Sequence, residues 1–176
     1  AIGIPVARMR FAAFLAGGDR PAVFQHGHRI DRAVVETQHL LGGVARDAAK
    51  DSPVPVQVHP FIEDMAAAFA AVDLVIARSG ASTTAELALM HKPSVLIPYL
   101  HATDNHQEHN AKGFVESGAA VLLRDNEMSP ESLADLVREL IGDRARLASM
   151  ERAAATLAKP GAADTIAAEI LSLPFD

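Results

Sequence analysis

Short runs of apolar, often β-branched residues alternate with longer runs rich in alanine and leucine along most of this chain. The short runs predict strands at Ala22–Gln25, Val54–Val58, Leu74–Ala77, Ser94–Pro98 and Ala120–Leu123. These runs are apolar throughout, which is typical of parallel strands that helices cover on both faces. The alternation therefore predicts an α/β domain with a mainly parallel, doubly wound sheet.

The longer runs predict the covering helices, near Arg29–Leu41, Ile62–Ala71, Thr83–Met90, Gln107–Ser117, Ala145–Leu157 and Ala162–Leu171. The best-marked helix follows Ser129, which we expect as its N-cap, with Pro130 at the first helical position. The first residues, Ala1–Leu15, also predict a helix. Since such a domain more often begins with a strand, we expect one strand to precede this segment. We find no linker, and 176 residues suit one domain, so we expect residues 1–176 to form a single unit.

Composition excludes several classes of function. The net charge is −6, no cluster of Lys and Arg occurs and aromatic residues make up 5%, so we expect no nucleic-acid partner. The chain has no cysteine, which excludes disulfide scaffolds, thiolate zinc sites and cysteine nucleophiles. No apolar run approaches the roughly 20 residues of a membrane-spanning helix, so we expect a cytoplasmic chain.

The segment after Leu74–Ala77 carries the strongest functional signal. A strand there runs into a small, hydroxyl-rich turn and then a helix, through Arg78, Ser79, Gly80, Ala81, Ser82 and Thr83. The unpaired N–H groups of a helix start suit a phosphate, Gly80 permits close approach, and Arg78 adds a charged donor. The alternative is a helix that Ser or Thr caps and that binds nothing.

Glu86 lies four residues after Ser82, one turn further along the same helix face. Its carboxylate is placed to accept both hydroxyls of a ribose. The alternative for Glu86 is a solvated helix glutamate.

A second polar segment, 98–111, leads from the next strand into a helix, so it lies at the same carboxyl edge, where open α/β sheets bind ligands. Its polar side chains suit a sugar. A metal site is an alternative, but His101, His106 and His109 match no dependable ligand spacing, so we expect no metal.

Two further turns follow strands. In one, Phe61 is placed to lie against a base whose edge the backbone of Ile62 reads, unless Phe61 is a core residue. In the other, His26 and His28 are candidates for ligands, for a base or for plain loop residues. No Ser-His-Asp arrangement, G-x-S-x-G elbow or Walker lysine motif occurs.

Together these segments resemble the C-terminal half of the MurG family, bacterial cell-wall glycosyltransferases that transfer N-acetylglucosamine from UDP-N-acetylglucosamine (UDP-GlcNAc) to the muramyl-pentapeptide lipid of peptidoglycan synthesis. The resemblance runs from about Pro21 to Ile170 and is carried by Pro60–Ala66, by Arg78–Ala81 with Thr83 and Glu86, and by Ala102–Ala111. It implies the C-terminal, Rossmann-like lobe of a GT-B glycosyltransferase.

The resemblance also assigns roles to residues. It implies that Phe61 stacks beside the uracil, that Ile62 reads the base and that Glu86 holds the ribose. It places the pyrophosphate and sugar near Arg78, Ser79, Gly80 and Ala81, with the helix start at Gly80–Thr83 stabilising the leaving UDP. His106, Gln107 and Asn110 would line the hexose pocket, although some relatives carry glutamine at position 106.

The family's N-terminal lobe, which faces the lipid and holds its base, has no counterpart in this chain. We therefore assign no catalytic base here, and expect the missing lobe as a partner, in cis or in trans, that brings in the lipid-linked acceptor at the inner face of the membrane. The expected transfer is inverting and independent of metal. A non-catalytic subunit of a split N-acetylglucosamine transferase and a UDP-sugar epimerase-like protein remain alternatives.

Overall fold

The computed structural model describes residues 9–14, 30–36, 50, 56–59, 61–99, 105–124 and 126–173. In these ranges one parallel sheet contains β1 (Met9–Phe14), β2 (Ile30–Glu36), β3 (Val56–His59), β4 (Leu74–Ala77), β5 (Ser94–Leu96) and β6 (Ala120–Leu122). The strand order is β3-β2-β1-β4-β5-β6. The order reverses between β1 and β4, as in a Rossmann-like doubly wound sheet, which confirms the predicted fold.

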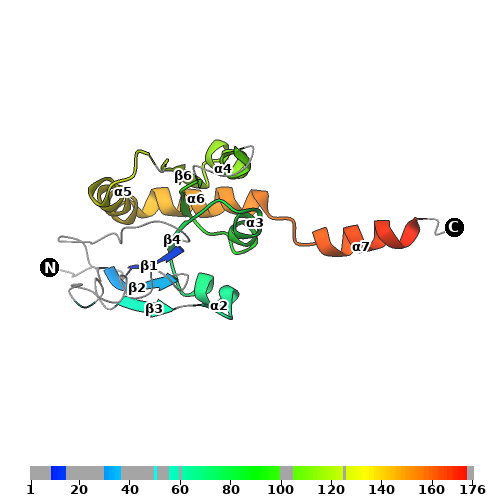
Figure 1. Ribbon diagram of the computed structural model, residues 1–176, viewed down its shortest axis with the longest axis horizontal. Coiled ribbons are helices and arrows are strands. Elements are labelled where there is room, and N and C mark those ends of the chain that lie inside the picture. The colour runs from blue at the N-terminus through cyan, green and yellow to red at the C-terminus, as the bar shows by residue number, and fades with distance from the viewer. Residues whose placement is uncertain are drawn as a thin grey trace.

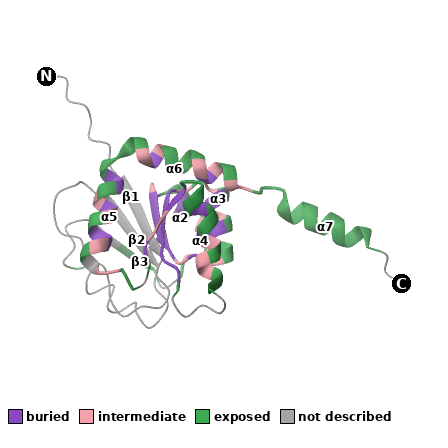
Figure 2. Cartoon of the chain, turned by 90° about the horizontal axis from the view of Figure 1, so that it is seen from above, coloured by how far each residue is buried: buried purple, intermediate pink, exposed green. Residues whose placement is uncertain are grey.

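Helices cover both faces of this sheet. They are α2 (Met65–Ala70), α3 (Ala81–Leu89), α4 (His106–Glu116), α5 (Pro130–Gly142) and α6 (Arg144–Leu157), and a last helix, α7 (Ala162–Ser172), follows them along the chain. Figure 2 shows α5 on one side of the strands, α3 and α4 on the other side, and α6 across one end. The five helices predicted by range between 62 and 171 are confirmed, each with ends within three residues of the prediction, and α5 begins at the predicted Pro130.

Strand β4 shows why its sequence is apolar throughout. Leu74 and Ile76 belong to a buried cluster with side chains of α5 and α6. Val75 and Ala77 point to the other face, where a second buried cluster includes Leu87 of α3 and Phe114 of α4. Because both faces of β4 are buried, no position of the strand favours a polar residue.

Helix α5 begins as its sequence predicts. The Ser129 hydroxyl accepts a hydrogen bond from the Ser132 amide at 3.1 Å, and the Ser132 hydroxyl accepts one from the Ser129 amide at 2.8 Å. Pro130 occupies the first helical position. This reciprocal capping confirms Ser129 as the N-cap residue.

The N-terminal part of the sheet differs from the prediction. The helices predicted at Ala1–Leu15 and Arg29–Leu41 are wrong where the structure describes them, because Met9–Phe14 and Ile30–Glu36 are strands. β1 pairs with β2 on one side and with β4 on the other, and this pairing overrides the helix propensity of its alanines. The strand predicted at Ala22–Gln25 lies outside the described residues.

Helix α7 stands apart from the rest of the fold. It projects away from the sheet and its covering helices (Figure 1), and none of its residues is buried. Ile166, Ile170 and Leu171 are exposed on it. Neither α7 nor any other helix in the described ranges is long and apolar enough to cross a membrane.

Candidate functional site

The start of α3, directly after β4, is an open helix end. Gly80 is the N-cap residue, no side chain hydrogen-bonds to the cap, and the first turn contains no acidic residue. The first helical hydrogen bond runs from the Thr84 amide to the Gly80 carbonyl at 2.9 Å. The amides of Ala81, Ser82 and Thr83 therefore precede the hydrogen-bonded ladder, and this positive helix end suits an anion.

The alternative that Ser or Thr caps this helix is wrong, because the cap is Gly80. Gly80 has φ −64°, which any residue adopts. A Cβ built on it would meet only the Thr83 hydroxyl, at 3.8 Å, which is ordinary contact. Neither the backbone nor the packing therefore requires glycine there, and the missing side chain leaves the backbone at the helix start uncovered.

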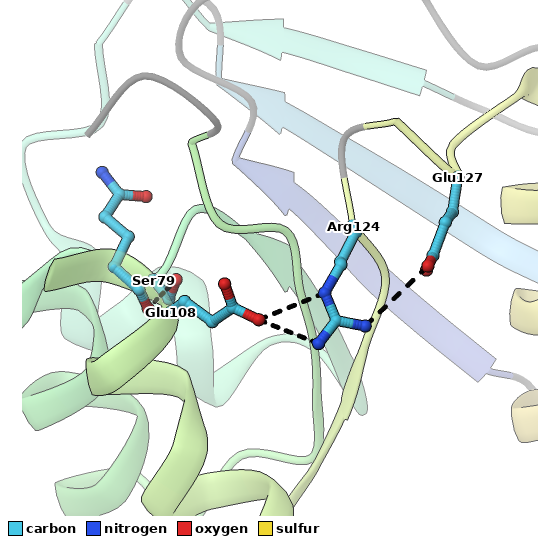
Figure 3. Close-up of polar contacts among 5 residues, drawn as sticks. Ser79, Glu108, Arg124 and Glu127 are labelled. Carbon is cyan, nitrogen blue, oxygen red and sulfur yellow. Dashed lines mark hydrogen bonds and ion pairs between the residues drawn. The ribbon is translucent and has the colours of Figure 1, made fainter. Parts of the chain in front are cut away.

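Ser79 joins the start of α3 to the start of α4. Its buried hydroxyl donates to the Gln107 carbonyl at 2.7 Å, and its carbonyl accepts from Asn110 Nδ2 at 3.0 Å. Ser79 therefore lies against the first turns of α4 (Figure 3). The one proton of its hydroxyl is engaged within the protein, while Ser82 is exposed and Thr83 partly exposed near the helix end.

Arg78 joins the carboxyl ends of β4 and β5. Its Nη1 atom donates to the carbonyls of Ile97 at 3.3 Å and Pro98 at 3.1 Å. Its guanidinium carbon lies 5.6 Å from the centre of the Tyr99 ring. These contacts hold the segment after β5 beside the turn after β4, and the contact predicted between Arg78 and a pyrophosphate stays a prediction.

Side chains at the start of α4 lie beside the turns that follow β4 and β5. Gln107 Oε1 accepts from the Tyr99 amide at 3.0 Å, and the Asn110 amide nitrogen is bonded to Ser79. Within the described part of the chain, these bonds leave Gln107 Nε2 as a donor and Asn110 Oδ1 as an acceptor for a ligand. His106, the first residue of α4, is exposed at the same helix start.

Glu86 lies on α3, one turn beyond Ser82, and is partly exposed. Among the residues that the structure describes, none pairs with its carboxylate. Its oxygens are therefore available as acceptors at the side of the open helix end.

Phe61 and Ile62 follow β3, at the edge of the sheet. Phe61 is 69% exposed, so the alternative that it belongs to the core is wrong. The structure does not place these residues next to the start of α3, because β2 and β1 lie between β3 and β4. Three strand spacings of about 4.8 Å put the ends of β3 and β4 about 14 Å apart along the same carboxyl edge.

The sequence predicts neither of two further sets of contacts, those of Tyr99 and those of Arg124. Tyr99 contacts both Arg78 and Gln107, and its sequence signals are its place in the polar segment 98–111 and its being the single tyrosine of the chain. Arg124, after β6, donates from Nε and Nη2 to Glu108 Oε1 at 3.1 and 2.8 Å. The Glu108 carboxylate raises the pKa of the Arg124 guanidinium above its usual value. No local pattern predicts this contact.

No cluster of three or more His, Asp or Glu side chains that could hold a metal ion occurs within the described ranges. His26, His28 and His101 lie outside those ranges.

Comparison with known proteins gives a consistent result. Residues 22–166 match a family model described as "Glycosyltransferase family 28 C-terminal domain". UDP-N-acetylglucosamine–N-acetylmuramyl-(pentapeptide) pyrophosphoryl-undecaprenol N-acetylglucosamine transferases are 46% identical over 122 residues in Myxococcus xanthus and 45% identical over 160 residues in Chlorobaculum tepidum. The crystal structure of Acinetobacter baumannii MurG superposes with a TM-score of 0.82 at 27% identity.

These matches cover most of this chain and a smaller part of each relative. They span 69% and 86% of the chain but 32% and 42% of the two curated transferases. The structural match spans 95% of the chain and 50% of the Acinetobacter protein. The chain thus corresponds to between about a third and a half of the length of these relatives.

Proposed function

We propose that this chain, which belongs to the glycosyltransferase family 28 C-terminal domain family, is the donor-binding half of an N-acetylglucosamine transferase of peptidoglycan synthesis. Its ligand is UDP-GlcNAc. The unit that binds the donor is a single domain over residues 1–176. Both curated relatives reported above carry the name of this transferase, which supports the choice of donor.

The open start of α3 is the observation that carries the proposal. The free amides of Ala81, Ser82 and Thr83 bind the pyrophosphate, and the missing side chain of Gly80 lets its oxygens approach the backbone. Ser82 is exposed and Thr83 partly exposed, so their hydroxyls add donors. Charge that develops on the departing UDP is stabilised by these fixed dipoles, and this supplies the electrostatic assistance without a metal ion.

The two ends of the donor lie on either side of this anion site. The hexose lies at the start of α4, where Gln107 Nε2 donates, Asn110 Oδ1 accepts and His106 closes the pocket. The nucleoside extends the other way, with Glu86 accepting the ribose hydroxyls. The uracil reaches Phe61 and Ile62, and the exposure of Phe61 supports a role as a stacking surface.

The reaction is a direct displacement at the anomeric carbon of the hexose, which inverts its configuration. The acceptor hydroxyl attacks, the bond to the UDP oxygen breaks, and UDP leaves. The base that takes the hydroxyl proton belongs to the second lobe, in cis or in trans. That lobe also binds the lipid-linked acceptor at the cytoplasmic face of the membrane, so the product is lipid II.

The ribose contact gives the sharpest test of the nucleotide site. We expect the chain to bind UDP about tenfold or more tightly than 2′-deoxy-UDP in isothermal titration calorimetry, because hydrogen bonds to a charged group contribute about 1.5–3 kcal/mol. Glu86→Gln removes the negative charge of the carboxylate and should reduce the difference in affinity between UDP and 2′-deoxy-UDP. Glu151→Gln, an exposed position on α6, is the matched control and changes neither affinity.

Two results would contradict the proposal. One is the absence of binding by the wild-type chain at millimolar UDP-GlcNAc. The other is a Glu86→Gln variant that still discriminates against 2′-deoxy-UDP as the wild type does. The chain alone should transfer no N-acetylglucosamine to the lipid acceptor, and turnover without a partner lobe would place the base within these residues.

A further inference from the structure

We propose that the ion pair between Glu108 and Arg124 is a positioning element that sets the affinity of the site for the hexose without touching the ligand. This inference rests on the proposed function, because it concerns the sugar end of the same donor. Neither residue carries a role in the site described above.

Among the described residues, no side-chain capping hydrogen bond fixes the start of α4. Its N-cap, Asn105, has a left-handed backbone with φ 52°, and the Asn105 side chain makes no capping hydrogen bond. A helix that is not capped by its own sequence depends on tertiary contacts for the orientation of its first turn. Gln107 and Asn110, the proposed hexose contacts, lie in this part of α4.

Contacts from three strand ends provide that orientation. Ser79, after β4, and Tyr99, after β5, bind the Gln107 carbonyl and side chain. Arg124, after β6, binds Glu108 with two nitrogens on a single carboxylate oxygen, 2.8 and 3.1 Å away (Figure 3). The contacts of Ser79 and Tyr99 lie on the proposed phosphate side of α4. Arg124 adds a contact to α4 from the end of β6, the next strand of the sheet.

A second carboxylate keeps the Arg124 side chain in place. Glu127 Oε1 lies 3.8 Å from Nη1, the guanidinium nitrogen that does not contact Glu108. Arg124 is thus fixed by two carboxylates, as Figure 3 shows. A guanidinium plane that already binds one partner loses little further conformational entropy when it binds a second. The two contacts of Arg124 therefore favour a fixed geometry between the end of β6 and the start of α4.

Helix α4 also carries a matched control. Lys112 and Glu116 form an ion pair at 3.7 Å within the same helix, with side chains 67% and 66% exposed. This pair spans one turn of α4 and joins it to no other element. Glu116→Gln therefore removes an ion pair of the helix without releasing its first turn.

The experiment compares the binding of UDP-GlcNAc and UDP by calorimetry. We expect Glu108→Gln and Arg124→Gln each to weaken UDP-GlcNAc binding by about two- to fivefold, the size of an exposed ion pair, while UDP binding stays unchanged. Glu116→Gln should change neither. The double variant should be no weaker than the Arg124→Gln variant, because both substitutions remove the ion pair between Glu108 and Arg124.

The ratio of the affinities for UDP-GlcNAc and UDP distinguishes a positioning role from a general loss of structure. The inference would be overturned if a variant left the ratio of the affinities for UDP-GlcNAc and UDP unchanged, for example by weakening both equally. Additive losses of affinity in the double variant would also overturn it. Both results would leave the proposed function intact. Failure of the wild-type chain to bind either ligand would overturn both. Melting temperatures of the variants should stay within about 4 °C of the wild type, because the pair is exposed.

Discussion

Gly80→Ala tests whether the open start of α3 is an anion site. The substitution adds one methyl group at the N-cap, where the added Cβ lies 3.8 Å from the Thr83 hydroxyl and causes no internal clash. The backbone angle of −64° also suits alanine. Folding therefore tolerates the change, whereas an anion on the adjacent amides meets the methyl group.

The effect on stability should be small. Alanine is a poorer N-cap than glycine by about 0.5–1 kcal/mol, and alanine restricts the unfolded chain by about 0.4–1 kcal/mol in the opposite direction. The net change in the free energy of unfolding is within about 0.5 kcal/mol. Loss of one hydrogen bond to the charged pyrophosphate removes about 1.5–3 kcal/mol, or about ten- to a hundredfold in the Kd for UDP.

Urea unfolding and calorimetric titration with UDP measure the two quantities on the same protein. Gly113→Ala is the matched control, because Gly113 lies inside α4 and a Cβ there meets nothing within 4 Å. It should stabilise the chain by about 0.5–1 kcal/mol and leave the affinity for UDP unchanged. If Gly80→Ala binds UDP like the wild type while folding normally, the amides at the start of α3 do not bind the pyrophosphate.

Three further predictions concern stability. Leu140→Ala removes a fully buried side chain of α5 and should lower the free energy of unfolding by about 2–5 kcal/mol in urea, whereas Leu171→Ala on α7, 79% exposed, should change it by less than about 0.5 kcal/mol. Ser94→Ala should stabilise the chain by about 1 kcal/mol in the same assay, because the buried Ser94 hydroxyl has no hydrogen-bond partner in the described structure; a loss of stability would reveal a partner. The backbone amide of Glu131 and then the Ser129 hydroxyl hold the pKa of the Glu131 carboxyl below its ordinary value of 4.5, so its ionised form favours folding. Glu131→Gln should therefore lower the melting temperature at pH 7. The difference in melting temperature from the wild type should vanish as the pH falls below 4.5 and through the folded-state pKa of Glu131. A difference that persists at that pH would contradict a stabilising role of the ionised carboxylate.

The parts of the fold that depend on local signals were predictable from sequence. Ser129 and Pro130 mark the start of α5, and the apolar run Leu74–Ala77 is a strand with the predicted limits. The turn that follows was predictable for the same reason, because a strand, a glycine and a helix occur in immediate succession. The chemistry of an open helix start depends on only those neighbouring residues.

The remaining features depend on contacts between distant segments. The segment Met9–Phe14 has helical composition and becomes a strand because two neighbours pair with it. Arg78 has the chemistry of an anion ligand, yet its guanidinium donates to the carbonyls of Ile97 and Pro98. The bond between Glu108 and Arg124 joins exposed charges from separate elements, and such pairs leave no periodic pattern in a sequence.

The strand order has a consequence for how the domain assembles. Among the described strands, the pairs β3-β2, β2-β1, β4-β5 and β5-β6 join strands that are consecutive along the chain. Only β1-β4 joins distant strands there, with Phe11 opposite Leu74. Each half of the sheet can thus form from nearby segments, while their junction requires one long loop to close, which slows folding. We expect the β1-β4 junction to form late and to open early. The donor proposed above would reach from Phe61 to the start of α3 and contact both halves, so its binding would hold this junction closed.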